Sequence, residues 1–308
     1  MSFPDVSLPV LMPPLGQMPD GGDIGPVRSG WKLAVREFSA NRLAVVGLAI
    51  LIFFILFCFL GPLVYHGDVL ITNLTDTNAP PGAGQPLGTD NQGFDEVALL
   101  MKGGQASLEV GIYSAFVGII IGTIWGAVSG LAGGIVDAVM MRIVDVLLSI
   151  PFLFVILIVA VRYGATVLSL SLIIGALFWP APARLVRGEV LTLRERDFVS
   201  AARVAGANRW RLIFKHLIPN AMGTTIVNGT FLVADAILSV AALGFLGFGL
   251  QYPNQDWGDM LSNGVNYLQD GYWWQIYPVG VCIVLVVMAF NLVGDALRDS
   301  LDVRLRRR

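Results

Sequence analysis

The chain has 308 residues, of which 55% are hydrophobic and 14% charged, and its formal net charge is −2. Charged residues make up roughly 25% of an ordinary soluble domain. This composition, with a mean hydropathy of +0.71, therefore excludes a large soluble core and indicates a polytopic membrane protein. The two cysteines, Cys58 and Cys282, lie in separate apolar segments, which predicts neither a disulfide framework nor a zinc cluster.

The first thirty residues differ in composition from the rest of the chain. They contain six prolines and no apolar run of the kind that forms the core of a signal peptide. We therefore expect residues 1–30 to be a disordered tail. We expect a single transmembrane domain over residues 31–308.

Apolar runs long enough to cross a bilayer, about 20 residues each, predict an all-α fold with six transmembrane helices. The predicted spans are about 43–65, 109–134, 139–161, 166–183, 221–249 and 276–297. The fourth span ends in the sequence WPAP (179–182). Because proline removes a helical hydrogen bond, we expect a kink at this point.

The basic residues are distributed asymmetrically around these spans. Of the 20 basic residues, all but Lys102 and Arg162 flank the chain ends, lie in segment 184–220 or begin the third span. The positive-inside rule then predicts that both termini and segment 184–220 are cytoplasmic. The loops 66–108 and 250–275 are rich in aspartate and are predicted to be extracytoplasmic. We expect the first loop to be irregular and to enter a short surface helix near Glu96. Either loop is placed to receive a substrate-binding protein.

Two features of the second and third predicted spans indicate helix packing. The second span carries glycines spaced by four, which permit close helix approach: Gly118, Gly122, Gly126, Gly130 and Gly134. We expect packing within the chain, with contact to a partner subunit as the alternative. In the third span, Arg142 and Asp145 are three residues apart and are predicted to form a structural ion pair on one helix face, which Asp137 is close enough to join.

The sequence contains none of the motifs of the common enzyme and nucleotide sites. There is no G-x-x-x-x-G-K-[ST], no H-E-x-x-H and no G-x-S-x-G. The two histidines, His66 and His216, fall on opposite sides of the predicted membrane and cannot share a metal ion. We therefore expect no catalytic site, no metal, no nucleic-acid partner and no cofactor bound by this chain.

One acidic residue lies near the middle of a predicted span. Asp235 is near the centre of the fifth span, whereas Asp145 lies nearer the cytoplasmic end of the third. A single midspan acid is thin support for an ion-coupled pathway, so energy is expected to arrive from another protein through a cytoplasmic contact. We expect Asp235 to face a pathway or a partner permease. At the end of the same span, Gly244, Gly247 and Gly249 predict either a gate near the outer mouth or tight packing.

The segment SAARVAGANRWRLIFKHLIP (200–219) lies between the fourth and fifth spans and predicts a basic helix–turn–helix elbow. Residues 194–205 are predicted to form one helix, which Gly206 ends in the left-handed conformation. Asn208 is predicted to cap a second helix, and Pro219 to end it. Ala201 and Ala202 allow close approach of a neighbouring surface.

The second predicted helix of this elbow is amphipathic. One face carries its apolar residues: Trp210, Ile213, Phe214 and Leu217. These side chains are predicted to anchor a cytoplasmic partner. The physics allows equally well a helix that lies on lipid headgroups.

Several segments of the chain resemble motifs of one transporter family. Ser200-Ala201-Ala202, Gly206 and Ile218-Pro219 resemble the E-A-A-x-x-x-G loop, with its late L-P, of binding-protein-dependent ABC importer permeases. LGTDNQGFD (87–95), MRIVDVLLSIPFL (141–153), LGFLGFGLQYPNQDWGDML (243–261) and FNLVGDALRDSLDVRLR (290–306) resemble further motifs of the dipeptide, oligopeptide and nickel permeases. The resemblance covers about residues 31–306 and is closest to the C-type subunit.

This resemblance implies a type I (MetI-like) permease fold in the cell membrane. It implies half of a translocation pathway for di- or oligopeptides, completed by a homologous second permease. Two cytoplasmic ATPase subunits would carry ATP and Mg²⁺, and an extracytoplasmic binding protein would deliver the cargo. The resemblance also implies that segment 200–219 couples to the ATPases. The alternatives are a non-peptide cargo such as nickel, a stand-alone secondary transporter or channel and, more remotely, a membrane enzyme.

Three residues depart from the pattern of this family. Ser200 stands where glutamate is usual, and Phe94 stands where arginine is usual. Val240 stands where the fifth span usually carries glutamate, and Asp235 supplies an acid five residues earlier. These departures bear on the energetics of coupling and on cargo preference rather than on the fold.

Overall fold

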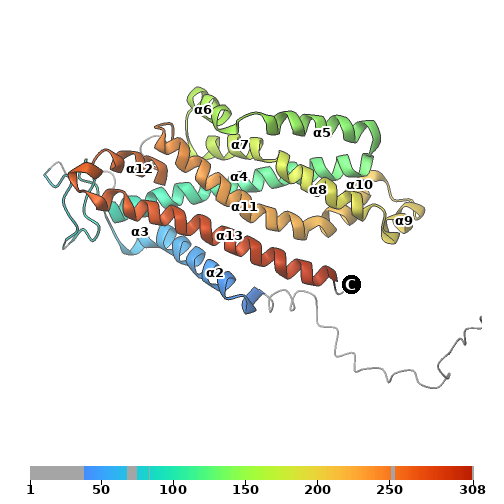
Figure 1. Cartoon of the computed structure of the whole chain (residues 1–308), viewed down its shortest axis with the longest axis horizontal. Coiled ribbons are helices and arrows are strands. Elements are labelled where there is room, and N and C mark those ends of the chain that lie inside the picture. The colour runs from blue at the N-terminus through green and yellow to red at the C-terminus, as the bar shows by residue number, and fades with distance from the viewer. Residues whose placement is uncertain (1–37, 68–74, 83, 251–253, 307–308) are drawn as a thin grey trace, which may run out of the picture.

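The structure is a computed structural model that describes residues 38–67, 75–82, 84–250 and 254–306, with side chains described as far as Leu301. The predicted tail, residues 1–30, lies outside this part. The described residues form an elongated bundle of helices and contain no β-strand, only isolated bridges such as that between Thr89 and Asp95 (Figure 1). The all-α prediction is therefore confirmed.

The first two long helices begin at side-chain caps. Helix α2 (Arg42–Ile55) starts after Asn41, whose side chain accepts hydrogen bonds from two backbone N–H groups. It continues through a π-helical turn, η1 (Leu56–Leu60), into α3 (Gly61–Val64). Helix α4 (Glu96–Ala132) starts after Asp95, whose carboxylate accepts from the N–H of Ala98 at 2.9 Å. The prediction of a short surface helix near Glu96 was thus right about its start and wrong about its length, because the helix continues unbroken for 37 residues.

The third predicted span is broken. Helices α5 (Gly134–Ser149) and α6 (Phe152–Tyr163) meet at an angle of 81°. Pro151 lies at this junction, where it cannot donate a hydrogen bond and disfavours a helical residue before it. Ile150 is accordingly extended, with ψ of 129°. The fourth span bends by 44° between α7 (Val167–Phe178) and α8 (Pro180–Leu193), at the predicted Trp–Pro site.

The remaining helices build the elbow, the fifth and sixth spans and the loop between them. The elbow contains α9 (Asp197–Val204), α10 (Arg209–Arg211) and the π-helical turn η2 (Leu212–Leu217). It leads directly into α11 (Ile218–Phe245). The chain then forms α12 (Trp257–Val265), two 3-10 turns, η3 (Leu268–Asp270) and η4 (Trp273–Gln275), and finally α13 (Tyr277–Arg306).

Four described helical segments are long and apolar enough to cross a membrane, and the number rises to six if each bent pair is one span. The four are Arg42–Val64, Glu96–Ala132, Arg209–Phe245 and Trp273–Leu301, and the bent pairs are α5 with α6 and α7 with α8. Helices α4 and α11 contribute to two hydrophobic clusters, one shared with α2, α12 and α13 and the other with α6 and α7. These two helices therefore form the centre of the bundle (Figure 1).

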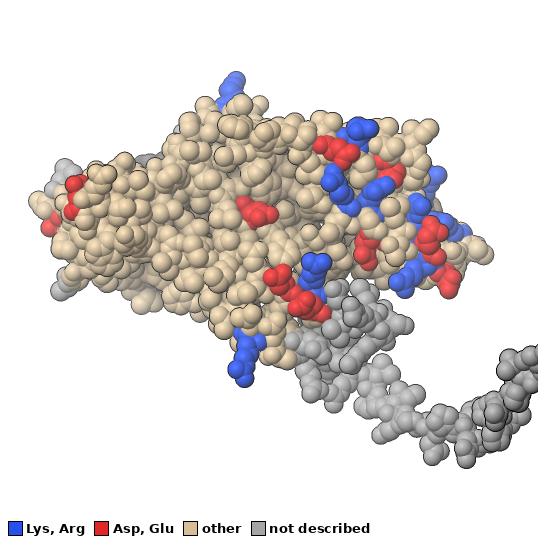
Figure 2. Space-filling model, in the orientation of Figure 1, with Lys and Arg blue, Asp and Glu red and all other residues tan. Residues whose placement is uncertain are grey.

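The two ends of the bundle differ in charge. Lys and Arg side chains gather at the end where α8, α9 and α10 lie, whereas the opposite end, with α3 and α12, shows a few acidic groups and little basic charge (Figure 2). The elbow thus occupies the basic end of the bundle.

Candidate functional site: the elbow, its ion-pair network and the midspan cavity

The turn of the elbow has the local structure that the sequence predicts. Gly206 has φ of +82°, a left-handed conformation that a residue with a Cβ adopts at a cost. Asn208 then caps α10, because its side-chain oxygen accepts from the N–H of Arg211 at 2.8 Å. Both predictions are confirmed. The first helix is shorter than predicted, since α8 ends at Leu193 and α9 begins only at Asp197.

The second helix of the elbow does not end at Pro219, as predicted. It runs without interruption from Arg209 to Phe245. Proline lacks an N–H group and its ring clashes with the carbonyl four residues before it. Here the preceding turn η2 is π-helical, so that the N–H of Ile218 bonds five residues back, to Ile213 O. The widened turn accommodates the proline, and the elbow is therefore a direct extension of α11.

The predicted apolar face of this helix is split between two surroundings. Trp210 and Phe214 are 60% and 53% exposed, and their rings stack with centroids 5.9 Å apart and an interplanar angle of 18°. In contrast, Ile213 and Leu217 are buried. The prediction that all four residues form one outward anchor was wrong, because the π-helical turn changes the angular step between side chains. The outward surface consists of the stacked pair, together with exposed Val204.

The buried side of the elbow packs onto the ends of α4 and α8. Val199, Ile213 and Leu217 share a hydrophobic cluster with residues of those two helices. Its members from α4 and α8 are Ala127, Val186, Val190 and Leu193. Ala202 packs against the same cluster, whereas Ser200 and Ala201 are exposed. The elbow is therefore fixed to the bundle on one side and open on the other.

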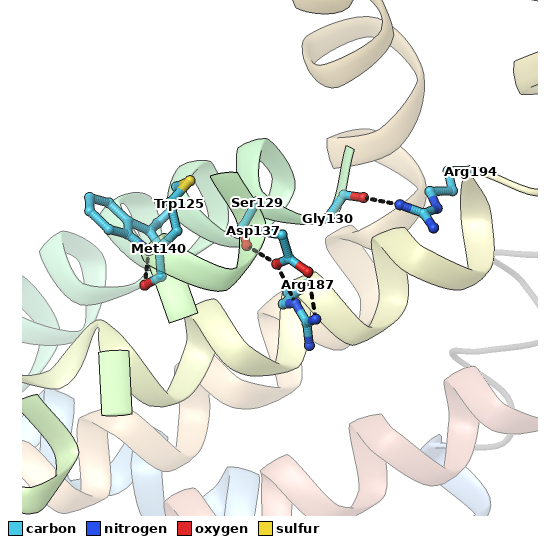
Figure 3. Close-up of polar contacts among 7 residues, drawn as sticks. All are labelled: Trp125, Ser129, Gly130, Asp137, Met140, Arg187 and Arg194. Carbon is cyan, nitrogen blue, oxygen red and sulfur yellow. Dashed lines mark hydrogen bonds and ion pairs between the residues drawn. The ribbon is translucent and has the colours of Figure 1, made fainter. Parts of the chain in front are cut away.

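An ion-pair network joins three helices beside this cluster (Figure 3). Arg187 of α8 donates two hydrogen bonds of 2.6 Å to the two carboxylate oxygens of Asp137 on α5. Asp137 also accepts from the hydroxyl of Ser129 on α4. Arg194, just after α8, donates to the carbonyl of Gly130 at 3.0 Å. The network thus ties the elbow end of α8 to α4 and α5.

The predicted ion pair between Arg142 and Asp145 is not formed. Asp145 instead pairs with Arg184 of α8 at 2.5 Å, while Arg142 is exposed. Helix α8 lies along α5 and presents Arg184 and Arg187 to Asp145 and Asp137. The pairs across two helices therefore replace the pair within one helix, and sequence spacing gave no indication of the partners on α8.

The glycine stripe packs within the chain, against α7 and α8. A Cβ at Gly122 would lie 2.7 Å from Trp179 O, and a Cβ at Gly126 would meet Ala183 O. Gly118 faces Gly175 O, and Gly130 faces Val190. Only glycine allows backbones to approach this closely. Gly134 is not part of the stripe, because α4 ends at Ala132.

A cavity of about 600 Å³ lies among α5, α6, α7, α8 and α11. Its walls are mainly leucine, isoleucine and phenylalanine side chains, including Ile150 and Phe152 at the α5–α6 break and Phe178 at the α7–α8 bend. Asp235 of α11 lines this cavity and is the one ionisable group among the described lining residues. The two bent helix pairs thus shape a hollow around the midspan acid.

The end opposite the elbow is closely packed. Asp256 is fully buried, and its carboxylate accepts from the N–H groups of Leu250, Gly258 and Asp259 at 2.9, 2.7 and 3.1 Å. Gly244 and Gly249 contact this carboxylate, while Gly247 takes φ of +81° in open space. What the structure shows for Gly244 and Gly249 is tight packing. Burial, and then the Asp256 carboxylate, raise the pKa of Asp259 to about 8.

The loop before α4 is held by residues from the other end of the chain. The carbonyl of Thr89 accepts from Trp274 Nε1 and Gln275 Nε2, each at 3.1 Å. Phe94 stands where the family that the sequence resembles usually has arginine. Here it is buried in the core cluster of α2, α4 and α13. This residue therefore serves packing here.

Comparison with known proteins places these features in a family. Residues 118–307 match the family described as "Binding-protein-dependent transport system inner membrane component", and residues 29–81 match "N-terminal TM domain of oligopeptide transport permease C". The first match spans more than half of the chain. The chain belongs to this family of transport-system membrane components.

Curated relatives of this permease cover most of its length. Dipeptide transport system permease protein DppC of Bacillus subtilis (strain 168) is 38% identical over 274 residues, 89% of this chain and 86% of that protein. Oligopeptide transport system permease protein OppC of the same strain is 38% identical over 278 residues, 90% of each. OppC of Escherichia coli (strain K12) is 37% identical over 281 residues, 91% of this chain and 93% of that protein. The resemblance seen in the sequence is thus confirmed.

Proposed function

We propose that this permease forms half of the translocation pathway of an ATP-driven importer for dipeptides or oligopeptides, with a homologous second permease as the other half. The cargo is supported by the names of relatives that are 37–38% identical over about nine-tenths of the chain. The midspan cavity at the two bent helix pairs supports a pathway role for this part of the bundle. A pathway that alternates between two sides requires such a hollow near the membrane midplane.

One observation supports the proposed coupling of this permease to cytoplasmic ATPase subunits. The exposed Trp210–Phe214 stack lies at the tip of a helix that is continuous with α11. Aromatic side chains that fill a partner's pocket commonly dominate such contacts. A push on this stack moves α11 directly, since no loop separates them. The packed cluster and the Arg187–Asp137 pair carry the same motion to α4, α8 and α5.

The proposed topology places the elbow and both termini in the cytoplasm of a cell with this permease in its inner or plasma membrane. The basic end of the bundle supports this orientation through the positive-inside rule (Figure 2). The opposite end, with loop 75–95 and α12, then faces outward and receives the substrate-binding protein. ATP and Mg²⁺ are bound and ATP is hydrolysed on the partner subunits.

Uptake by cells that lack the gene for this chain tests the proposal. Radiolabelled dipeptide and oligopeptide uptake is expected to fall in the deletion strain and to return with the wild-type gene. Uptake should stop when ATP is depleted and persist when only the proton gradient is collapsed. Loss of nickel uptake with normal peptide uptake would refute the peptide cargo, and uptake that follows the proton gradient would refute ATP coupling.

A further inference from the structure

Asp235 presents an exposed carboxylate within a hollow whose other described lining residues carry no charge. It lines the midspan cavity, and no hydrogen bond or ion pair joins it to any other residue that the structure describes. The nearby hydroxyl of Ser239, which also lines the cavity, donates to the backbone carbonyl of Asp235 at 2.7 Å and leaves the carboxylate free. A carboxylate at membrane depth is costly unless it meets a cation or water. The carboxylate is therefore placed to meet a cation that enters the hollow.

The walls of the cavity define what kind of cation fits. Ile150, Phe152 and Leu232 are among the apolar groups around the carboxylate. A volume of about 600 Å³ is within the usual range of about 300–1,000 Å³ for sites that bind small molecules through apolar walls and a few placed polar groups. Acidic atoms in the mid-section of this face are surrounded by uncharged ones (Figure 2). The site thus suits a ligand with one cationic end and a variable, largely apolar remainder.

We propose that Asp235 binds the N-terminal ammonium group of the peptide during its passage, an inference that rests on the proposed peptide cargo. The α-amino group, with an ordinary pKa of about 8, is mostly protonated at neutral pH. It is the one positive charge that every unmodified peptide carries, whatever its sequence. The apolar walls then contact the side chains without selecting among them. A single charge pair holds the peptide weakly enough for release.

The competing occupant is a basic side chain of the second permease. If such a side chain paired with Asp235, the carboxylate would stabilise the assembly and would make no distinction between cargoes. The two occupants therefore differ in what a neutral substitution removes. Loss of the charge removes cargo discrimination in the first case and subunit association in the second.

Equilibrium binding to the assembled importer, purified with its partner subunits into lipid nanodiscs without the binding protein, tests the proposal. The probes are Ala-Ala-Ala, its N-acetyl form and its C-terminal amide. The wild type is expected to bind the N-acetyl peptide about tenfold more weakly than the free peptide, because a charge-assisted hydrogen bond is lost. The amide, which keeps the ammonium group, is expected to bind at least as well as the free peptide.

Three variants complete the test. Asp235→Asn should bind the free and N-acetyl peptides alike, and Asp235→Glu should keep the preference. Asp270→Asn, which removes an exposed carboxylate outside the cavity, is the matched control and should match the wild type. Equal preference in the wild type and Asp235→Asn would overturn the inference, as would loss of the second permease from Asp235→Asn on size-exclusion chromatography. Absence of binding by every peptide form, with normal peptide uptake by cells, would also overturn the inference, whereas loss of the dependence of peptide uptake on this gene would refute the proposed cargo.

Discussion

Each end of the bundle carries a tryptophan, and the two are used in opposite ways. Trp257 lies at the end opposite the elbow, which the proposed topology makes the outer end. It is fully buried, and its indole Nε1 donates to Leu100 O at 3.0 Å. Trp210, at the elbow, is 60% exposed and stacks on Phe214, which is itself exposed. Both lie at the start of a helix, α12 in one case and α10 in the other. Their sequence contexts therefore say little about the difference.

The difference separates a packed tryptophan from an exposed aromatic pair, although the outer end also exposes Trp273. At the outer end, buried polar groups such as Asp256 and Thr89 O find their hydrogen bonds within the chain. At the elbow, the inner side is packed in the same way, but the outer side leaves aromatic and aliphatic surface uncovered. Exposed apolar patches on otherwise polar surfaces mark interaction sites. The elbow is thus packed against its own bundle on one side and leaves an apolar surface exposed on the other.

The largest expected effect comes from removing the two tryptophans in turn. Trp257→Ala should lower the free energy of unfolding by about 3–5 kcal/mol, because it leaves a cavity in the core. Trp210→Ala should change it by less than about 0.5 kcal/mol, as for a surface side chain. Denaturant unfolding of the purified chain in detergent measures both. Equal losses of unfolding free energy in the two variants would contradict the difference in packing between the two tryptophans.

A second comparison tests how tightly α4 and α8 pack against each other in the middle of the bundle. Gly126→Leu should destabilise the chain by roughly 1–3 kcal/mol or more, because a side chain there meets the backbone of α8. Gly188→Leu on α8 is the matched control, since a Cβ at that position meets nothing within 4 Å. Thermal unfolding of both variants should show the loss in Gly126→Leu alone. A normal melting temperature for Gly126→Leu would mean that α4 and α8 separate easily.

The ion pairs between α5 and α8 allow a finer comparison along one helix. Arg187→Gln should cost about 1–3 kcal/mol, because it leaves the Asp137 carboxylate, whose side chain is 12% exposed, without its charged partner. Arg184→Gln should cost less than about 1 kcal/mol, since that pair is about half exposed. The free energy of unfolding of both variants, measured in the same detergent, tests this ranking. A larger loss for Arg184→Gln would reverse our ranking of the two pairs.

The outer end should also respond to pH through Asp259. Its folded pKa of about 8 exceeds the ordinary value of about 3.9 that we assume for the unfolded chain. The folded state then holds a proton that the unfolded state loses, so the stabilisation is complete below about pH 4 and is lost as the pH rises towards about 8. Melting temperatures at pH 5, 7 and 9 should show Asp259→Asn gaining on the wild type with each step. A difference in melting temperature between Asp259→Asn and the wild type that stays the same at all three pH values would contradict the raised pKa of Asp259.

Local features of the elbow could be predicted from the sequence because they depend on a few neighbouring residues. The left-handed Gly206 and the Asn208 cap need only their own turn. The bend at Pro180 is of the same kind. The 81° break at Pro151 was missed because the apolar run continues across it, and hydropathy alone does not register a change of direction.

Features that depend on the meeting of distant segments could not be predicted. The partners of Asp137 and Asp145 lie on α8, about 40 to 50 residues away, and only the packing of α5 on α8 brings them together. The separation of Ile213 and Leu217 from Trp210 and Phe214 follows from the π-helical turn, whereas a regular helical period places all four on one face. The cavity around Asp235 likewise arises from two bends in separate helix pairs.

The central claim is that the open side of the elbow binds the ATPase, and a matched pair of charge substitutions tests it most directly. Phe214→Asp and Trp273→Asp each place a carboxylate at an aromatic residue that is about half exposed, one at the elbow and one at the outer end. The measurement is the amount of ATPase subunit that copurifies with the membrane complex, relative to the amount of this chain. We predict a loss of at least tenfold for Phe214→Asp and wild-type retention for Trp273→Asp. Full retention of the ATPase by Phe214→Asp would contradict the account.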